Sequence, residues 1–243
     1  MKILLTNDDG IDAAGINTLF DVLSSEHTVY MFAPANQKSA CSNAINVHSP
    51  VRVDFKGKNR FAVHGYTADC VYIGLISSLA EPVDLVISGI NHGPNLGNDI
   101  HYSGTVGGAR TGQIAGISSL AVSLNSHDKG DNLINCAQYI KKYIEEHNPG
   151  KSKKPYFLNI NYPDVSPELI KGEKTVKLGR RNYVNSYFIN EESDSHLMIS
   201  LKGELQKTEE IETDTSEIDK GFITITPLLL DATDYESIKA GSV

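Results

Sequence analysis

Apolar residues in the first part of the chain follow two alternating patterns, one typical of buried strands and the other of helices. Residues 2–6 form a short apolar run that ends in polar residues, which predicts a buried strand. Residues 28–33 predict a second strand, which Pro34 ends. Between these strands, four apolar residues recur at helical spacing and share one helical face: Ile16, Leu19, Phe20 and Leu23.

This alternation continues to about residue 165. The further predicted elements are helices over 68–79, 105–114 and about 133–144, and strands over 83–87, 119–123 and 157–161. Strands that alternate with helices indicate βαβ units and a mostly parallel sheet. We therefore predict a doubly wound, three-layer α/β core over residues 1–165. In such sheets, ligands bind beyond the carboxyl ends of the strands.

The pattern changes after residue 165, where helical periodicity fades. Residues 183–189 and 196–201 predict two strands around an acidic turn at 190–195, and residues 222–226 predict a last strand. The stretch 202–217 between them is charged and only weakly apolar. We predict a β-rich extension over 166–243, which serves either as an oligomer contact or as a lid on its own subunit.

The composition limits the classes of function. The 243 residues carry a formal net charge of -8. An acidic chain does not offer the broad basic surface that nucleic-acid polymers need, so we expect no such partner. A phosphate ester remains compatible with this charge, because a metal ion or backbone N–H groups can supply the local positive field.

Membrane and redox signals are weak. No apolar run approaches the roughly 20 residues of a membrane span, and two carboxylates follow the short N-terminal apolar run at once, unlike in a signal peptide. The three cysteines are scattered and form no CxxC pair. We therefore expect a cytoplasmic protein without a membrane partner.

Two adjacent carboxylates, Asp8 and Asp9, end the first strand and precede Gly10. Neighbouring carboxylates repel one another and favour a cation beside them, and their hard oxygen atoms suit Mg²⁺, Mn²⁺ or Ca²⁺. An exposed Asp-Gly turn is the alternative interpretation of the same residues. The pair is a candidate metal site because it lies where an α/β sheet binds ligands.

Three later loops carry further polar candidates. Residues 36–43 follow the second strand and are rich in small polar side chains, and residues 88–99 follow another strand and hold three asparagines. Residues 103–105, Ser-Gly-Thr, precede a predicted helix, where hydroxyl and free N–H groups bind anions. Ordinary helix capping is the alternative there. His92 and His101 lie in the same region without an evident triad partner.

Taken in order, these segments resemble the SurE family of survival-protein nucleotidases. The resemblance rests on residues 1–10, 33–43 and 88–106, with weaker support at 65–71, 159–161 and 224–228. It spans nearly the whole chain. The chain departs from the family pattern at Ala14, at Tyr66 and in the stretch 108–111, which leaves the base preference open.

The resemblance implies a Rossmann-like three-layer core with a swapped C-terminal arm, assembled as a homodimer or homotetramer. It implies one divalent ion per subunit, Mg²⁺ or Mn²⁺, and hydrolysis of nucleoside 5′- and 3′-monophosphates. The implied metal ligands are Asp8, Asp9, Ser39 and Asn91, of which the two aspartates are also catalytic. The implied phosphate and substrate residues are Asn43, Asn95, Ser103, Gly104 and Thr105.

Two alternatives to a nucleotidase remain at this level. One is a broad-specificity phosphatase or exopolyphosphatase, for which an aromatic residue that stacks on a base, such as Tyr66 or Tyr102, would be unnecessary. The other is a non-catalytic nucleotide-binding protein. The mechanism is also open between attack by water and attack by a carboxylate, which would give an aspartyl-phosphate.

Overall fold

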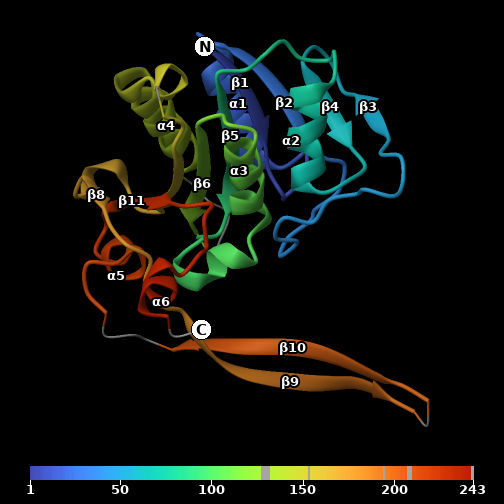
Figure 1. The fold of residues 1–243 in the computed structure, drawn as a ribbon, viewed down its shortest axis with the longest axis vertical. Coiled ribbons are helices and arrows are strands. Elements are labelled where there is room, and N and C mark those ends of the chain that lie inside the picture. Colours follow the sequence, from blue (N-terminus) through green and yellow to red (C-terminus); the bar gives the residue numbers. More distant parts are fainter. Residues whose placement is uncertain (127–131, 153, 194, 207–209, 242–243) are drawn as a thin grey trace.

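One large sheet forms the centre of the computed structural model, which describes residues 1–126, 132–152, 154–193, 195–206 and 210–241 (Figure 1). Among these residues the sheet has nine strands in the order β3-β4-β2-β1-β5-β6-β7-β11-β8. The strands are β1 (Lys2–Thr6), β2 (Thr28–Pro34), β3 (Val53–Phe55), β4 (Arg60–Val63), β5 (Leu85–His92), β6 (Ser119–Asn125), β7 (Phe157–Pro163), β8 (Glu173–Thr175) and β11 (Ile223–Leu228). All neighbouring pairs are parallel except β3–β4 and β7–β11. The predicted mostly parallel α/β fold is confirmed.

Helices cover both faces of this sheet and complete three layers (Figure 1). The helices are α1 (Ala14–Ser24), α2 (Thr67–Ile76), α3 (Gly104–Ile114), α4 (Leu133–His147), α5 (Asp214–Ile218) and α6 (Tyr235–Ala240), with short 3₁₀ turns η1 (Gly97–His101), η2 (Pro149–Lys151) and η3 (Pro167–Leu169). Helices α1 and α4 pack together on one face, and α2 and α3 pack together on the other.

Alternation within the strands explains the two faces. In β1, Ile3 and Leu5 belong to the apolar cluster beneath α1 and α4, whereas Leu4 belongs to the cluster beneath α2. All three side chains are fully buried. A strand covered on both sides has no reason to alternate apolar with polar residues, which is why this one is a continuous apolar run.

Several elements differ from the sequence prediction. Strands β3, β4 and β8 were not predicted, because three or four residues are too few to show a periodicity. Helix α2 ends at Ile76 rather than at Leu79. The last strand, β11, joins the core sheet by pairing antiparallel with β7.

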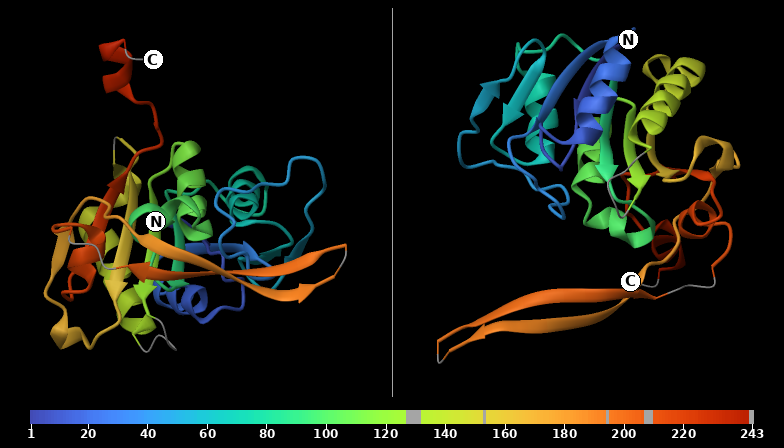
Figure 2. Two further views of the ribbon diagram at one scale, coloured as in Figure 1. Left: turned by 90° about the horizontal axis from the view of Figure 1, so that it is seen from below. Right: turned by 180° about the vertical axis from the view of Figure 1, so that it is seen from behind.

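A long antiparallel hairpin, β9 (Asn182–Glu192) with β10 (Leu197–Gln206), leaves the core, as both views in Figure 2 show. Its two strands cover most of the predicted strands 183–189 and 196–201, and each continues further along the chain than predicted. The predicted turn at 190–195 includes residue 194, and the predicted charged stretch at 202–217 includes residues 207–209; these four residues lie outside the described part. Helix α6 also stands away from the core.

The sequence predicts no membrane-spanning segment, and the helices of the structure can be compared with that prediction. In the described part of the chain, every helix is too short or too polar to cross a lipid bilayer.

We expect Gly15→Ala to destabilise the fold, because α1 approaches β5 closely at this glycine. A Cβ atom on Gly15 would lie 2.0 Å from the carbonyl oxygen of Ile90. Such overpacking forces the neighbouring backbone to shift and lowers the free energy of unfolding by about 1–3 kcal/mol. Urea unfolding followed by circular dichroism measures the loss, with Asp21→Ala on the exposed face of α1 as the control. Equal unfolding free energies for Gly15→Ala and the wild type would contradict the close approach.

Candidate active site

The end of β1 forms a tight turn that fixes the two adjacent carboxylates. The side chain of Asn7 accepts a hydrogen bond from the Gly10 N–H at 3.2 Å and donates one to the Gly10 carbonyl at 2.9 Å. Gly10 has φ +104°, in the region that favours glycine. The turn leaves Asp8 4% exposed and Asp9 half-buried. The aspartates are therefore held by the backbone and do not lie in a solvated turn.

The neighbours of β1 in the sheet bring two more predicted segments to this pair. Strand β1 lies between β2 and β5, so the loops that follow all three strands meet. The backbone N–H of Lys38, next to Ser39, donates to the Asp8 carbonyl at 2.7 Å. The backbone N–H of His92, next to Asn91, donates to Asp9 Oδ2 at 3.1 Å. The structure thus brings the segments of all four predicted metal ligands together.

The N-terminus of α3 completes the site from the other side. The Thr105 hydroxyl donates a hydrogen bond to Asp8 Oδ1. A Cβ atom on Gly104 would lie 2.8 Å from the Asp8 side chain and 2.8 Å from Cys41 Sγ. Any larger residue at position 104 would collide with the carboxylate, so the glycine allows the helix N-terminus to approach it.

Burial makes the negative charge of this pair costly. Removal from water, together with the nearby charge of Asp9, raises the pKa of Asp8 to about 6, against the opposing hydrogen bond from Thr105. Burial also raises the pKa of Asp9, while the N–H of His92 acts in the opposite direction. A cation between the carboxylates would offset this cost.

The donor atoms fit Mg²⁺ or Mn²⁺. Two carboxylates, a hydroxyl and a side-chain amide are hard oxygen donors. Asn91 Nδ2 donates to the Gly93 carbonyl at 2.7 Å, so its amide oxygen is the atom available to a metal. Ser39 is exposed, and its hydroxyl accepts from Gln37 Nε2 at 2.9 Å. The described residues contain no group of three His, Cys, Asp or Glu side chains suited to a metal. The predicted ligand set has only two carboxylates, and its other two ligands are a hydroxyl and an amide.

The predicted phosphate residues fall into two groups. Ser103, Gly104 and Thr105 lie at the α3 N-terminus beside Asp8, and the Ser103 hydroxyl caps the helix by accepting from the Val106 N–H at 3.0 Å. By contrast, the side chains of Asn43 and Asn95 bind the scaffold. Asn43 Nδ2 donates to Thr111 Oγ1 at 3.1 Å, and Asn95 Nδ2 donates to Ser123 Oγ at 2.8 Å. Each amide nitrogen keeps a second proton.

Comparison with known proteins bears on the family and the fold of this chain. The family model described as Survival protein SurE matches residues 3–185. This chain belongs to the SurE family. Proteins named 5′-nucleotidase SurE from Leptospira interrogans and Clostridium beijerinckii are each 40% identical to it, over 97% of this chain and 94% and 95% of theirs. The crystal structure of the SurE protein from Aquifex aeolicus superposes with a TM-score of 0.86 at 33% identity and covers 99% of this chain and 98% of its own.

Some residues that hold the loops of the candidate site in place were not identified as site residues from the sequence. Asn161 Oδ1 accepts from the Asn95 N–H at 2.9 Å, and the amide nitrogens of Asn159 and Asn161 donate to the Asn95 carbonyl at 2.7 and 3.0 Å. Asp69 is buried and accepts from the N–H and the side chain of Asn46 and from the Tyr66 N–H. Asparagines inside a buried strand are a usable signal, because strands disfavour them and a buried amide needs partners.

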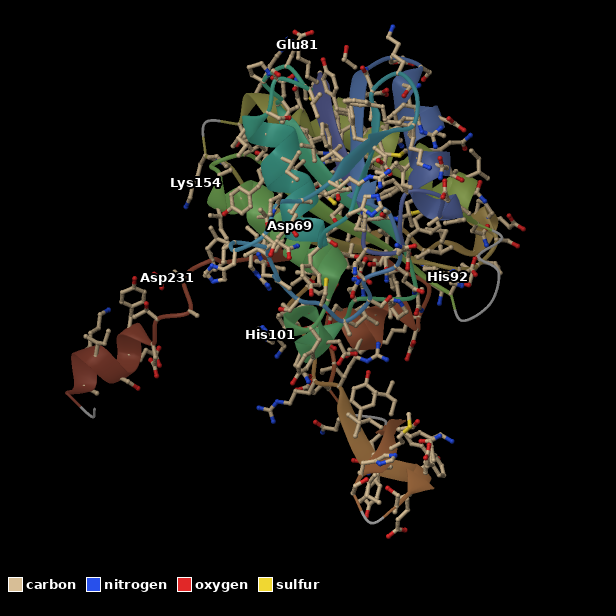
Figure 3. The ribbon with its side chains drawn as sticks, turned by 90° about the vertical axis from the view of Figure 1, so that its right-hand side faces the viewer. Asp69, Glu81, His92, His101, Lys154 and Asp231 are labelled. Carbon is tan, nitrogen blue, oxygen red and sulfur yellow. The ribbon has the colours of Figure 1, made fainter. Side chains whose placement is uncertain are left out.

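A hollow of about 780 Å³ adjoins the α3 N-terminus at the base of the hairpin. Its lining residues are Asn98, Asp99, Tyr102, Arg181, Asn182 and Tyr183. Figure 3 shows His92 and His101 at the end of the core from which the hairpin extends, and Glu81 at the opposite end. The carboxylates, the helix N-terminus and the hollow therefore share one end of the molecule.

We expect Asp8→Asn to stabilise the metal-free SurE fold at pH 7. The substituted amide keeps an acceptor for Thr105 but carries no buried charge. The folded pKa of Asp8, about 6, lies above the ordinary value, so the carboxylate destabilises the fold increasingly as pH rises from about 4 to about 6. The full effect is about 2–3 kcal/mol above pH 6 and absent near pH 4.

Chemical unfolding in EDTA at pH 4, 6 and 7 measures this effect, with Asp12→Asn as an exposed control. A stability difference between Asp8→Asn and the wild type that stays constant from pH 4 to pH 7 would refute the pKa-based explanation.

Proposed function

We propose that this SurE-family chain is a divalent-metal-dependent phosphomonoesterase that hydrolyses nucleoside 5′- and 3′-monophosphates to nucleoside and phosphate. The observation that carries the proposal is the buried Asp8 carboxylate, which lies beside Asp9 and against the N-terminus of α3. Two relatives that align over nearly their whole length are named 5′-nucleotidase. A cation-binding carboxylate pair next to an anion-binding helix end is suited to a phosphate ester.

The metal would be one Mg²⁺ or Mn²⁺ per subunit, held by Asp8, Asp9, Ser39 and Asn91. When bound, it would supply Lewis acidity for the phosphate oxygens and lower the pKa of a coordinated water. The chain's own anion site is the N-terminus of α3, where the Gly104 N–H points out of the helix and the Val106 N–H is capped by Ser103. The Ser103 hydroxyl accepts from Val106, so its proton remains available to a phosphoryl oxygen.

Asp9 is the better placed of the two aspartates to take a proton from the attacking water. It is half-buried, whereas Asp8 is 4% exposed and bound by Thr105. In this scheme the water oxygen bonds to phosphorus, the bond from phosphorus to the sugar oxygen breaks, and that oxygen takes up a proton. The competing mechanism has a carboxylate as nucleophile, and trapping an aspartyl-phosphate on Asp8 or Asp9 would favour it.

The hollow beside Ser103 favours a nucleotide over a simple phosphate ester. Tyr102 is 68% exposed and Tyr183 is 39% exposed, and both line this hollow. Exposed aromatic rings next to a phosphate site can stack on a base. Tyr66, the other aromatic candidate, instead lies under the Lys38 ammonium group at 5.3 Å.

We expect Asp9→Asn to lower kcat/KM for nucleoside monophosphates at least about a hundredfold, roughly 3 kcal/mol of transition-state stabilisation. The loss follows from removing a charged metal ligand and proton acceptor. Phosphate release is measured with 5′- and 3′-nucleoside monophosphates, an aryl phosphate and short polyphosphate, each with EDTA, Mg²⁺ or Mn²⁺.

Asp12→Asn, an exposed aspartate in the same loop, is the matched control and keeps wild-type activity. Near-normal activity of Asp9→Asn with metal still bound would refute its assignment. Equal rates on every ester would favour a broad phosphatase or exopolyphosphatase. Nucleotide binding without release under any metal would favour the non-catalytic binding protein.

We further propose a cytoplasmic homodimer or homotetramer built through the hairpin, with no nucleic-acid polymer or membrane as partner. The pairing places Tyr183 opposite Leu205, Tyr187 opposite Leu201 and Ile189 opposite Ile199. Because side chains alternate between faces, these three pairs lie on one face of the hairpin. Leu201 is 91% exposed there. A two-stranded hairpin is marginally stable by itself, so a second copy of the chain is a suitable cover for this face.

We expect the double variant Tyr187→Lys/Leu201→Lys to be monomeric at micromolar concentration, because two cations would be desolvated in the apolar contact. Size-exclusion chromatography with light scattering measures the mass. Glu204→Lys, on the opposite face of the same hairpin, is the control and keeps the wild-type mass. An unchanged oligomer in the double variant would show that this face is not the contact.

A further inference from the structure

The segment between β5 and α3, residues 94–103, carries part of the proposed substrate site and is held from three directions. We call it the substrate segment. It begins near Asn95, whose backbone is bound by two asparagines of β7, and it ends at Ser103, the cap of α3. Its middle has no strand partner of its own, because it forms the 3₁₀ turn η1. What fixes this middle portion therefore decides where the phosphate residues lie.

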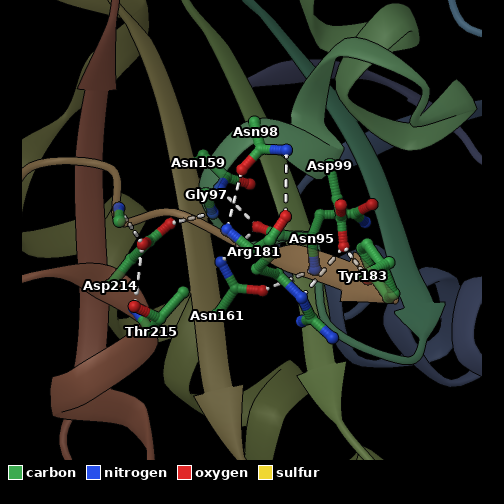
Figure 4. Close-up of polar contacts among 11 residues, drawn as sticks. Asn95, Gly97, Asn98, Asp99, Asn159, Asn161, Arg181, Tyr183, Asp214 and Thr215 are labelled. Atoms are coloured by element: carbon green, nitrogen blue, oxygen red, sulfur yellow. Dashed lines mark hydrogen bonds and ion pairs between the residues drawn. The ribbon is translucent and has the colours of Figure 1, made fainter. Parts of the chain in front are cut away.

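A buried contact to the middle comes from Asp214, at the start of α5. This carboxylate is fully buried and accepts three backbone hydrogen bonds. Oδ2 accepts from the Gly97 N–H at 2.8 Å, and Oδ1 accepts from the Gly179 N–H at 2.7 Å and from the Thr215 N–H at 2.8 Å (Figure 4). One side chain thus joins the substrate segment to the chain that enters the hairpin.

Close backbone contact reinforces this junction. Gly97 has φ +52°, and a Cβ atom there would lie 2.6 Å from the Gly179 carbonyl oxygen. A Cβ atom on Gly179 would lie 2.2 Å from Thr215 Oγ1. Two glycines at one junction allow three backbones to meet around the carboxylate. A buried carboxylate with three N–H donors is well satisfied, and losing one of these bonds leaves a buried polar group without its partner.

The outer side of the substrate segment is bound to the hairpin base. Asn98 Oδ1 accepts from the Arg181 N–H at 2.7 Å, and Asn98 Nδ2 donates to the Arg181 carbonyl at 3.2 Å (Figure 4). Asp99 Oδ2 lies 3.0 Å from Arg181 Nε and accepts from the Tyr183 hydroxyl at 2.6 Å. The Asp99 carbonyl in turn accepts from the Ser103 N–H at 3.2 Å. These contacts connect the hairpin base to the α3 cap through Asn98 and Asp99.

We propose that Asp214 is a positioning residue of the active site, which holds the substrate segment against the hairpin base so that Ser103 and the α3 N-terminus meet the phosphate. The inference rests on the proposed phosphomonoesterase function. The three hydrogen bonds of Asp214 go to the backbones of Gly97, Gly179 and Thr215, so it acts through the substrate segment and not on the reacting atoms.

Asp214→Asn tests this role with almost no change of shape. A carboxylate accepts at both oxygens, whereas an amide accepts at one and donates at the other, so the variant cannot hold both Gly97 and Gly179. We expect KM for nucleoside monophosphates to rise at least about tenfold while kcat changes less than about threefold, because phosphate binding is loosened and the metal ligands are untouched. Mn²⁺ affinity stays within about twofold, as expected for separate sites.

Hydrogen exchange provides the readout that does not depend on turnover. In metal-free protein, amides of residues 95–103 and 177–181 exchange faster in Asp214→Asn, and those of β1 are unchanged. Gly179→Ala disturbs the same junction from the hairpin side and gives the same KM change, which keeps the test available if Asp214→Asn does not fold. Ser216→Ala weakens the cap of α5 at Thr213 but leaves the three N–H donors to Asp214 in place, and it is the matched control.

The outcomes separate the two ideas. Unchanged exchange at residues 95–103 in both junction variants overturns the role of Asp214, as does faster exchange with an unchanged KM. An equal rise of KM in Ser216→Ala shows a general effect of α5 stability and also overturns it. If the wild-type protein releases no phosphate with any metal, the proposed function fails instead, and exchange alone then decides whether Asp214 holds the segment.

Discussion

The carboxylate of Asp8 is buried at the carboxyl end of β1, and much of the surrounding structure lowers the free-energy cost of burying its charge. Thr105 donates to it, and the Asn7–Gly10 turn fixes the backbone on either side of it. Gly104 allows the positive end of α3 to approach. Even so, the pKa of Asp8 remains raised, so these interactions only partly offset the cost of burial. A site that destabilises the metal-free fold in this way is suited to bind a cation.

The loops around this carboxylate are fixed by polar side chains that bind backbone groups. Asn161 binds both backbone groups of Asn95, Asp69 binds the loop at Asn46, and Asp214 binds Gly97. Each of these side chains supplies hydrogen-bond partners for a segment that lies outside the strands and α-helices. Irregular backbone that is buried needs such partners, because an unpaired buried N–H or C=O costs free energy. The buried polar side chains at this end of the sheet therefore hold the loops in place, in addition to any part they have in binding.

The hairpin places the proposed contact with a second copy at the same end of the molecule. Its outer part carries an apolar face formed by cross-strand pairs such as Tyr187 with Leu201, while its base binds the substrate segment through Arg181 and Tyr183. A contact between the outer part and a second copy would thus be connected, through the hairpin base and the substrate segment, to residues near the α3 cap. This arrangement gives a physical reason for a β extension on an otherwise complete α/β core.

The sequence by itself determined the α/β class and most core strands and helices, because burial imposes a local periodicity on each of these elements. It also indicated the hairpin, whose exposed strands are runs rich in β-branched and aromatic residues around a polar turn. It also indicated the neighbourhood of Asp8 and Asp9, since loops at the carboxyl ends of adjacent parallel strands must meet. Tertiary structure alone decided that Asn43 and Asn95 bind the scaffold, that β11 completes the core sheet, and that Asp214 reaches Gly97 across 117 residues of chain. These features depend on which buried polar group finds which partner in space, and no local pattern encodes that choice.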